Sequence, residues 1–414
     1  MSSIINATTT NGLKLQPDNS GSLVLQTNNG TTAVTVDTSQ NTTLAGKLTT
    51  ASSGIQFSDA SIQTAAASPY VLKNRIINGD MRIDQRNAGA SVTLTNTGVY
   101  TVDRWQGVED TDGGMTAQQD SSAPAGFVNS LKCTTTTADG SLSATQYAVV
   151  LQKIEGTNIS DLAWGTANAR TVTLSFWVRS SLTGTFGGSL SNSANNRSYP
   201  FTYTISVADT WEQKSITIAG DTSGTWLTTT GVGINIHFGL GVGSTYSGTA
   251  GAWAGAQFLS ATGATSVVGT NGATFYLTGV QLEVGTSATP FERRMYGQEL
   301  ALCQRYFEKS YNQDTAIAAA TQTGMILMPN VLNFSSKAYT QTIYYKVTKR
   351  TTPTVTPYAY NGTSGQWNTG VIGVNEQLGT ANLDLSSESK VGLAVAYTVT
   401  PNCAYGHFTA SAEL

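Results

Sequence analysis

The stretch Arg170–Ser181, RTVTLSFWVRSS, decides the fold of the middle of the chain. Apolar side chains recur in it at every second position, at Val172, Leu174, Phe176 and Val178. Successive side chains of a β-strand point to opposite faces, so this period places the apolar side chains together on one face. The stretch therefore predicts a strand with one face in a hydrophobic core.

Strands of the same kind are predicted after this stretch. Alternating segments occupy residues 201–207, 212–220, 233–240 and 274–284. In residues 233–240 we expect Ile236 and Phe238 to point inward and His237 to point outward. Turns rich in Gly and Asn separate the segments, and no helical period intervenes. Residues 73–295 therefore predict an antiparallel jelly-roll sandwich in an all-β protein.

One helical pattern follows the sandwich, in RMYGQELALCQRYFEKSY, residues 294–311. Its apolar stripe has the spacing i, i+4, i+7 and i+11, at Tyr296, Leu300, Cys303 and Phe307. This spacing predicts a short amphipathic helix of three or four turns. Two roles stay open: the helix packs against its own chain, or three copies meet near a threefold axis through Leu300, Cys303 and Phe307.

Strands return after this helix, so residues 296–414 predict a helix plus a distal β domain. Residues 342–350 should place Ile343, Tyr345 and Val347 on one side, and residues 391–400 alternate in the same way. A final strand is expected at the end of the chain. Between them, TTPTVTPYAYNGTSGQWN at residues 351–368 is rich in aromatic residues, Pro and Gly, which indicates a surface loop or a sheet edge.

Residues 1–72 carry short apolar pairs separated by turn residues, at Leu13/Leu15, Leu23/Leu25, Val34/Val36 and Ile55/Phe57. A strand with two apolar side chains buries too little area to offset an ordering entropy of roughly 1–2 kcal/mol per residue. A flexible leader is one interpretation. We favour a β-repeat stalk in an intertwined homotrimer, with Leu13, Leu15, Leu23, Leu25, Val34 and Val36 as contacts between chains.

The composition excludes several classes of function. Charged residues make up only 11% of the chain and the formal net charge is -3, so no basic field exists to attract nucleic acid. No apolar run is long enough for membrane insertion, and the amino terminus has no signal-peptide pattern. The cysteines Cys133, Cys303 and Cys403 are far apart and odd in number, which favours folding in a reducing cytoplasm.

No catalytic or metal-binding motif is visible. His237 and His407 are the two histidines, too few for a zinc site without other ligands nearby. The acidic cluster Glu109, Asp110 and Asp112 is best interpreted as a solvated turn, because a glycosidase needs two carboxylates facing each other across a groove. We therefore expect no enzyme activity, no catalytic residues, no metal and no cofactor.

Aromatic residues among neutral polar ones point to sugars as ligands. A sugar has an apolar C–H face and a rim of hydroxyls, which suits a flat ring beside neutral hydrogen-bonding groups. Trp177 has the opposite parity to its apolar neighbours, so it belongs either to a second core layer or to an exposed platform. The candidates for glycan contact are Trp177, Trp226, Trp253, Tyr358, Tyr360 and Trp367.

Two resemblances extend this interpretation. TVTLSFWVR, WEQKSITI and FYLTGVQLEV resemble the jelly-roll carbohydrate-binding modules of secreted glycosidases. Modules of that family usually hold a structural calcium with acidic residues of the last strand. LTGVQLE stands at this place here, so Asp80 and Glu283 would be remnants of such a site. NRIINGDMRIDQR at residues 74–86, GVQLEVGTSATPFERR at residues 279–294, and LVLQTNNGTTAVTVDTSQN at residues 23–41 resemble fibre and receptor-binding proteins of tailed bacteriophages.

The phage resemblance implies a homotrimeric virion fibre, assembled in the host cytoplasm, that binds host-surface glycan. Residues 1–72 would attach it to virion tail or capsid proteins. A capsid head fibre or decoration protein is one alternative, and a bacterial carbohydrate-binding protein or depolymerase is another.

Overall fold

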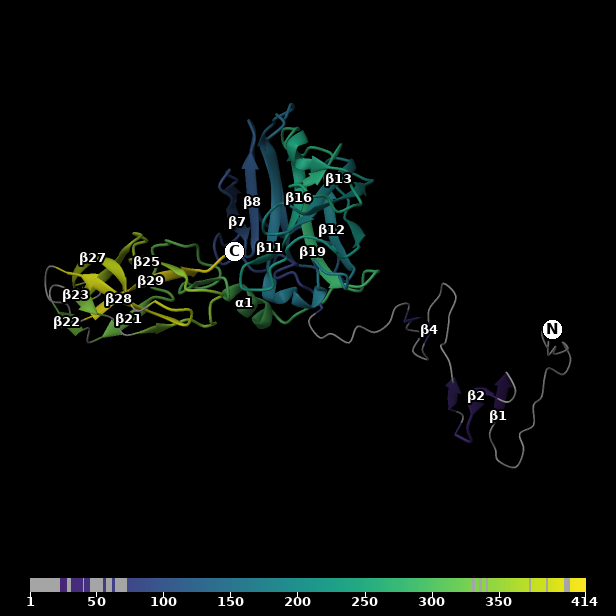
Figure 1. Cartoon of the computed structure of the whole chain (residues 1–414). Helices are drawn as coiled ribbons and strands as arrows, with labels where there is room; N and C mark the ends of the chain where they lie inside the picture. The colour runs from purple at the N-terminus through teal and green to yellow at the C-terminus, as the bar shows by residue number, and fades with distance from the viewer. Residues whose placement is uncertain are drawn as a thin grey trace. The chain divides into compact units, whose positions relative to one another are not determined.

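The computed structural model describes residues 73–329, 332–334, 337–339, 342–371, 374–384, 386–397 and 403–414, and in the first segment residues 23–27, 31–39, 41–44, 55–56 and 62–63. The chain divides into two compact units, Met1–Pro69 and Tyr70–Leu414. β-Strands are the main regular structure of the described residues, which contain one α-helix (Figure 1). The predicted all-β class is confirmed.

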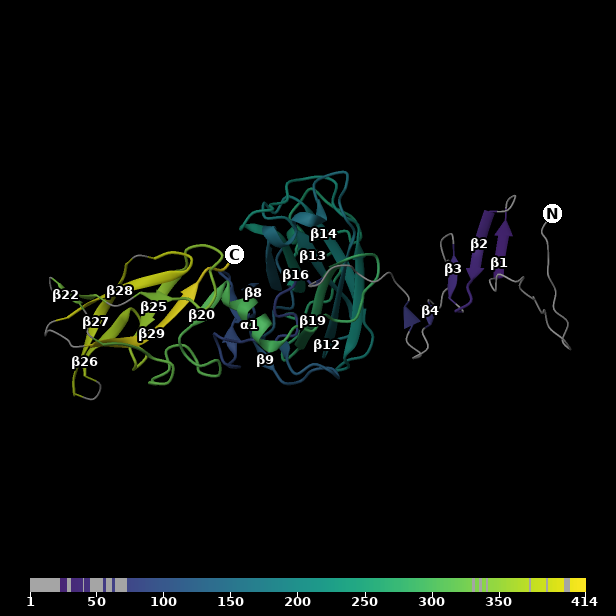
Figure 2. The same cartoon turned by 90° about the horizontal axis from the view of Figure 1, so that it is seen from below.

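Two six-stranded antiparallel sheets form the sandwich (Figures 1 and 2). The first has the order β15 (Glu212–Ile218), β12 (Val172–Ser180), β19 (Thr274–Val284), β10 (Ser130–Thr137), β9 (Gly114–Asp120) and β6 (Val92–Thr93). The second has the order β14 (Ser198–Ile205), β13 (Gly184–Ser191), β16 (Val232–Val242), β11 (Tyr147–Glu155), β8 (Trp105–Asp110) and β7 (Val99–Val102). The predicted alternating strands are therefore all present.

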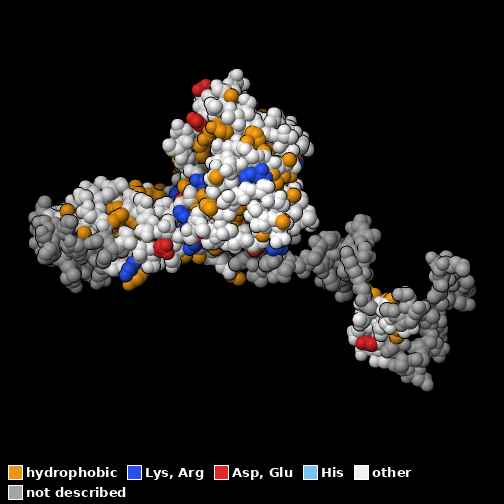
Figure 3. Space-filling model, viewed as in Figure 1, with side chains coloured by type: hydrophobic (Ala, Val, Ile, Leu, Met, Phe, Trp, Pro, Cys, Tyr) orange, Lys and Arg blue, Asp and Glu red, His pale blue; other side chains and the backbone are white. Residues whose placement is uncertain are grey.

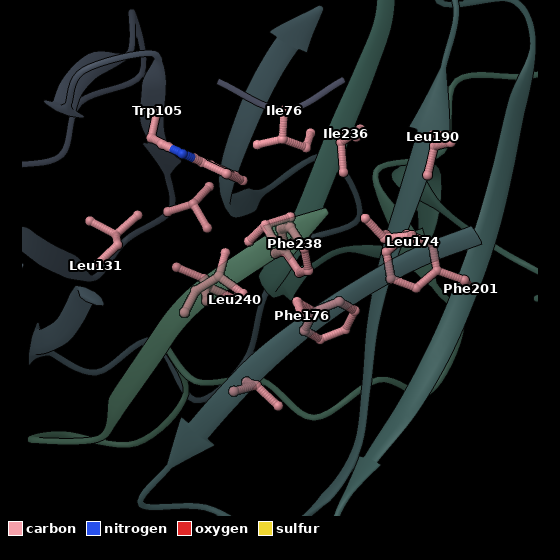
Figure 4. Packing of buried hydrophobic residues seen from close by; sticks show 14 of the residues in the cluster. Ile76, Trp105, Leu131, Leu174, Phe176, Leu190, Phe201, Ile236, Phe238 and Leu240 are labelled. Carbon is pink, nitrogen blue, oxygen red and sulfur yellow. The ribbon is translucent and has the colours of Figure 1, made fainter. Parts of the chain in front are cut away.

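The core lies between the two sheets, where the inward side chains of both meet (Figure 4). Phe176 of β12 and Phe238 of β16 are fully buried, and their rings meet edge to face at 5.0 Å. Trp105 of β8 is buried beside them and donates its indole N–H to the carbonyl of Asn78. Each large buried side chain contributes roughly 1.5–3 kcal/mol, so this interior is the main source of stability.

Helix α1, Tyr296–Gln304, is shorter than the prediction. Phe307 instead begins strand β20, Phe307–Lys309, which pairs with the final strand, because that pairing satisfies its backbone groups. Cys303 and Phe307 are buried within their own chain, and Leu300 packs against the same cluster as Cys303. The prediction that Cys303 and Phe307 contact other chains is wrong for this reason, whereas packing against the same chain is observed.

Strand β29, Cys403–Ser411, is an interior strand of the distal sheet, and it confirms the predicted final strand. It pairs with β20, β21 (Ile326–Pro329), β25 (Thr354–Tyr358) and β26 (Gln366–Val371). The remaining strands are β22 (Leu332–Phe334), β23 (Lys337–Tyr339), β24 (Ile343–Tyr344), β27 (Val374–Asp384) and β28 (Lys390–Ala396).

The structure decides between the two alternatives for residues 351–368. They are a sheet edge and not a surface loop, because β25 lies within them and pairs with β29, and β26 begins at Gln366. A second prediction is wrong. The strand expected over residues 342–350 ends at Tyr344. The backbone N–H of Tyr345 donates to Ser389, and that of Lys346 to the carboxylate of Glu308, so this segment leaves the ladder.

Two ion pairs stabilise the segments after the sandwich. Arg305 forms two hydrogen bonds with the buried Glu155 of β11, at 2.7 and 3.0 Å, and so joins these segments to the sandwich. The ammonium of Lys349 lies 2.6 Å from Glu308 of β20, and both side chains are almost completely buried. Removing one partner of this second pair leaves an uncompensated buried charge, so it holds the distal segments to each other.

In the first unit, β1 (Leu23–Thr27), β2 (Thr31–Val36) and β3 (Thr42–Leu44) form an antiparallel sheet, and β4 (Ile55–Gln56) pairs with β5 (Ile62–Gln63). The register pairs Leu23 with Val36, and Val34 with both Leu25 and Leu44. Leu25 is 45% exposed and Val34 and Val36 are half-buried. Leu13, Leu15 and the side chain of Leu23 lie outside the described residues, so contacts between chains stay a prediction.

Candidate functional site

A groove of about 330 Å³ lies on the outer face of the second sheet. The inner face of β16 carries Ile234, Ile236 and Phe238, which belong to the main core. Asn235 and His237 alternate with them and therefore face the other way, into the groove. The lining residues are Asn96, Thr97, Gln106, Val108, Tyr147, Val149, Leu151, Lys153, Ser193, Asn195, Val232, Asn235, His237, Gln257 and Leu259.

The strand register arranges the floor of the groove in rows across β8, β11 and β16. Leu151 of β11 stands between Gln106 of β8 and His237 of β16. One row further along, Lys153 of β11 is paired with Asn235. Opposed residues of antiparallel strands share a face, so these five side chains form one continuous surface.

One end of the groove is apolar. Val149, Leu151 and Leu259 are buried together, and the half-buried ring of Tyr147 packs against them. Tyr246 meets Tyr147 edge to face at 5.4 Å, which fixes the tyrosine ring beside the groove. This end can cover the C–H face of a ligand.

The other end of the groove is polar. The side-chain amide of Asn235 donates to Ser191 Oγ at 3.3 Å and to the Asn192 carbonyl at 3.2 Å. Lys153 Nζ donates to the Leu414 carbonyl oxygen at 2.9 Å. Burial, with the Arg104 charge second, lowers the pKa of Lys153. Lys153 is the one charged side chain among the described residues that line the groove.

His237 lies at the polar edge of the floor and is only 5% exposed. Its Nδ1 is 3.2 Å from Ser189 Oγ, and Ser189 Oγ is 2.6 Å from the Phe258 carbonyl oxygen. Burial lowers the pKa of His237 from 6.5 to about 4, with the nearby Lys153 charge acting in the same direction. The imidazole is therefore neutral at neutral pH. The alternation along the strand predicted that His237 points outward. That the segment around Phe258 lies beside it could not be predicted from the sequence.

Trp226 and Trp253, two of the predicted glycan contacts, belong to a cluster with Trp164. The rings of Trp164 and Trp226 meet edge to face at 4.8 Å, and both contact Trp253 at 5.3 and 5.4 Å. Trp226 belongs to the main core, where Trp164 and Trp253 pack against its ring, so the prediction that it contacts a glycan is wrong. Trp253 is half-buried and donates its indole N–H to the Ala219 carbonyl at 2.8 Å.

The distal aromatic candidates do not form an open site either. Trp367 is fully buried and donates its indole N–H to the His407 carbonyl, so it has no ring face for a sugar. The prediction that Trp367 contacts a glycan is therefore wrong. Tyr358 and Tyr360 are half-buried, and they pack near Tyr311 and Tyr405 respectively.

Trp177 lies on the outer face of the first sheet, away from the groove. It is half-buried, between the two alternatives that the sequence left open. Gly279 lies beneath it with φ +60°, where an added Cβ would come within 3.0 Å of Trp177 and 2.8 Å of Phe127. Trp177 thus packs closely over the backbone of Gly279 beside Phe127. The side chains predicted from the sequence to contact a glycan are therefore spread over several places in the fold.

The predicted acidic remnants of a calcium site have protein partners. Asp80 lies 3.1 Å from Arg82, and Glu283 accepts hydrogen bonds from Thr289 and Gln281. Within the described residues, no group of three His, Cys, Asp or Glu side chains could hold a metal ion. The one α-helix described is too short to cross a membrane. Figure 3 shows few charged side chains on the face it presents.

Comparison with models of protein families and with curated proteins found no match. Among solved structures, the enzymatically active domain of bacteriophage CBA120 tailspike protein 4 is 12% identical, with a TM-score of 0.27. The match covers 51% of this chain and 21% of the tailspike chain, so this chain spans about a fifth of that protein.

Carbohydrate-binding modules are also similar to this chain. A family 11 module of a Clostridium thermocellum cellulosomal cellulase is 11% identical over 48% of this chain and 98% of the module, with a TM-score of 0.25. The amino-terminal cellulose-binding domain of Cellulomonas fimi β-1,4-glucanase C is 17% identical over 44% of this chain and 90% of that domain, with a TM-score of 0.22.

Proposed function

We propose that this chain is a non-catalytic fibre protein of a tailed-phage virion that binds host-surface glycan in the groove on β8, β11 and β16. The chemistry of the groove supports the proposal most strongly. Its apolar end, formed by Val149, Leu151 and Leu259, suits the C–H face of a sugar ring. Its polar end offers Asn235 and the neutral His237 to the hydroxyls, beside the single charged side chain, Lys153.

The groove also supports binding without cleavage. Hydrolysis of a glycosidic bond needs two carboxylates on either side of it. The described residues that line the groove include neither Asp nor Glu. A sugar held here would therefore meet hydrogen-bonding groups but no acid and base pair.

The assignment to a virion rests on the sequence resemblance to phage fibres and on the low charge of the chain. A tail fibre that contacts the host is our first choice, and a capsid head fibre or decoration protein is the alternative within the virion. A bacterial carbohydrate-binding protein would use the same groove. In each case residues 1–72 would provide the attachment to other proteins of the assembly.

Homotrimer formation is part of the proposal. Leu25 and Leu44 of the first unit, which both pair with Val34, are 45% and 41% exposed in the single chain. Burying such side chains between copies would give the short sheet the core that it lacks. Three weak sites, each binding on the order of millimolar, would then act together with much higher avidity. Light scattering tests this: the expected mass is three times 43.4 kDa, and a monomer would refute the trimer.

Binding to an array of bacterial-surface glycans tests the function itself. Leu151→Arg places a charge on the groove floor and should lower glycan affinity at least about tenfold, because it removes an apolar side chain that would contact the sugar ring. Thr204→Arg is the matched control: Thr204 is exposed on the edge strand β14 of the same sheet. Equal binding by the wild type and Leu151→Arg would contradict the proposed site, and absence of wild-type binding would contradict the function.

A further inference from the structure

The hydrogen bonds of Ser189 determine which nitrogen of His237 carries the proton. The Ser189 hydroxyl lies 2.6 Å from the Phe258 carbonyl oxygen, which can only accept. A hydroxyl has one hydrogen, so Ser189 donates it to Phe258 and can only accept from the imidazole. At 3.2 Å, His237 Nδ1 is therefore the donor to Ser189 Oγ, and Nδ1 carries the proton.

The other nitrogen, Nε2, is consequently a hydrogen-bond acceptor at the groove. A neutral imidazole with its proton on Nδ1 has a lone pair on Nε2. The imidazole is neutral because it is buried and because Lys153, the charged neighbour on the groove floor, disfavours a second positive charge. Tyr147 is the remaining titratable side chain that lines the groove. Among the described residues, Nε2 has no hydrogen-bond partner, and it is accessible from the groove.

Asn235 provides a second acceptor on the same strand. Its amide nitrogen is directed at Ser191 and Asn192, and the Asn192 carbonyl can only accept, so the nitrogen position is fixed. The amide oxygen is then the polar atom left for a ligand. Residues two apart on a strand are about 7 Å from each other on one face. His237 and Asn235 thus present two acceptors along β16 beside the apolar seat of Leu151.

We propose that His237 Nε2 and Asn235 Oδ1 determine the specificity of the groove, selecting an uncharged sugar whose hydroxyls donate to both. The inference rests on the proposed function and names the class of sugar that the groove takes. Each sugar hydroxyl carries one hydrogen, which it can donate to such an acceptor. A carboxylate, sulfate or phosphate oxygen at the same place carries none and would leave the acceptors unpaired, at a cost in affinity.

Long-range ¹H–¹⁵N NMR of the full chain tests the proton position without any ligand. The chain has two histidines, so His237→Phe assigns the signals of His237 by their disappearance. We expect the proton on Nδ1 at pH 7 and an unprotonated Nε2. A proton on Nε2 in the wild type would overturn the inference, whether or not the variant folds.

Calorimetric titration tests the selectivity. The probes are cellohexaose, maltohexaose and xylohexaose, with cellohexaose oxidised to the acid at its primary hydroxyls as the charged counterpart. We expect a neutral probe to bind, its acid form to bind at least about tenfold more weakly, and His237→Phe to weaken neutral binding about tenfold. His237→Gln, whose amide oxygen can accept, should retain most of the affinity.

The outcomes separate this inference from the proposed function. Equal affinity of the wild type and a folded His237→Phe for a neutral probe would overturn the role of His237 but leave glycan binding intact. Tighter binding of the acid form would overturn the assignment of an uncharged sugar. If only charged glycans bind on the array, the function stands and this inference falls; if no glycan binds, both fall.

Discussion

Acidification should destabilise the sandwich through His237, and the size of the effect follows from its burial. The pKa of His237 is lowered from 6.5 to about 4 by desolvation. Between these values the unfolded chain binds a proton that the folded chain excludes, so stability falls as the pH falls. Each pH unit in this interval corresponds to ~1.4 kcal/mol, which gives about 3 kcal/mol in total and about 2.5 kcal/mol by pH 4.5.

The comparison of wild type with His237→Gln isolates this effect, because glutamine does not titrate. Other groups change in the same interval: burial raises the pKa of Asp103 to about 6, which favours the folded state on acidification. Such terms are common to both proteins and cancel in the difference.

Urea unfolding at pH 7.5, 6.0, 5.0 and 4.5 provides the free energies of unfolding. We expect wild type to lose about 2.5 kcal/mol relative to the variant between pH 7.5 and pH 4.5, with most of the change below pH 6.5. A difference that stays constant within about 0.5 kcal/mol over this range would refute a neutral, buried His237.

Three further substitutions or modifications test the packing. Glu308→Ala should lower the free energy of unfolding in urea by about 3–5 kcal/mol, because it leaves the Lys349 charge buried without its partner. A Glu308→Leu/Lys349→Met double variant, which removes both charges, should be more stable than Glu308→Ala, and equal stability of the two would contradict this reason. Gly188→Ala should cost at least about 1–3 kcal/mol, since its Cβ would collide with the backbone of β16, whereas Gly255→Ala meets nothing and should change stability by less than about 0.5 kcal/mol. Cys133, buried with its pKa raised to about 12, should resist thiol reagents at pH 8 until the chain unfolds.

The sandwich could be predicted from the sequence because its signal is local. In β12 and β16 the apolar residues occupy every second position, and a single strand contains all the information needed to define its two faces. The parity that directed Ile236 inward also directed His237 outward, and both directions are observed.

The groove could not be predicted, because it depends on lateral pairing. Gln106, Leu151 and His237 are far apart in the sequence and meet only through the register of three strands. Alternation gives the face of each side chain but neither the order of strands in the sheet nor the register between them.

The aromatic candidates failed for a related reason. Trp226 follows a turn-like sequence, yet it is buried because Trp164 and Trp253 converge on it from other segments. Trp367 lies in a stretch rich in Pro and Gly, where β26 is held by pairing with β27 and β29. Burial of this kind is set by tertiary contacts, which local composition does not record.

The most direct test of glycan binding in the groove is a crystal structure of the chain soaked with the oligosaccharide that binds it best. We predict a sugar ring over Leu151, with hydroxyls within hydrogen-bond distance of His237 Nε2 and Asn235 Oδ1. A sugar bound instead on Trp177, on the outer face of the other sheet, would contradict the groove as the binding site.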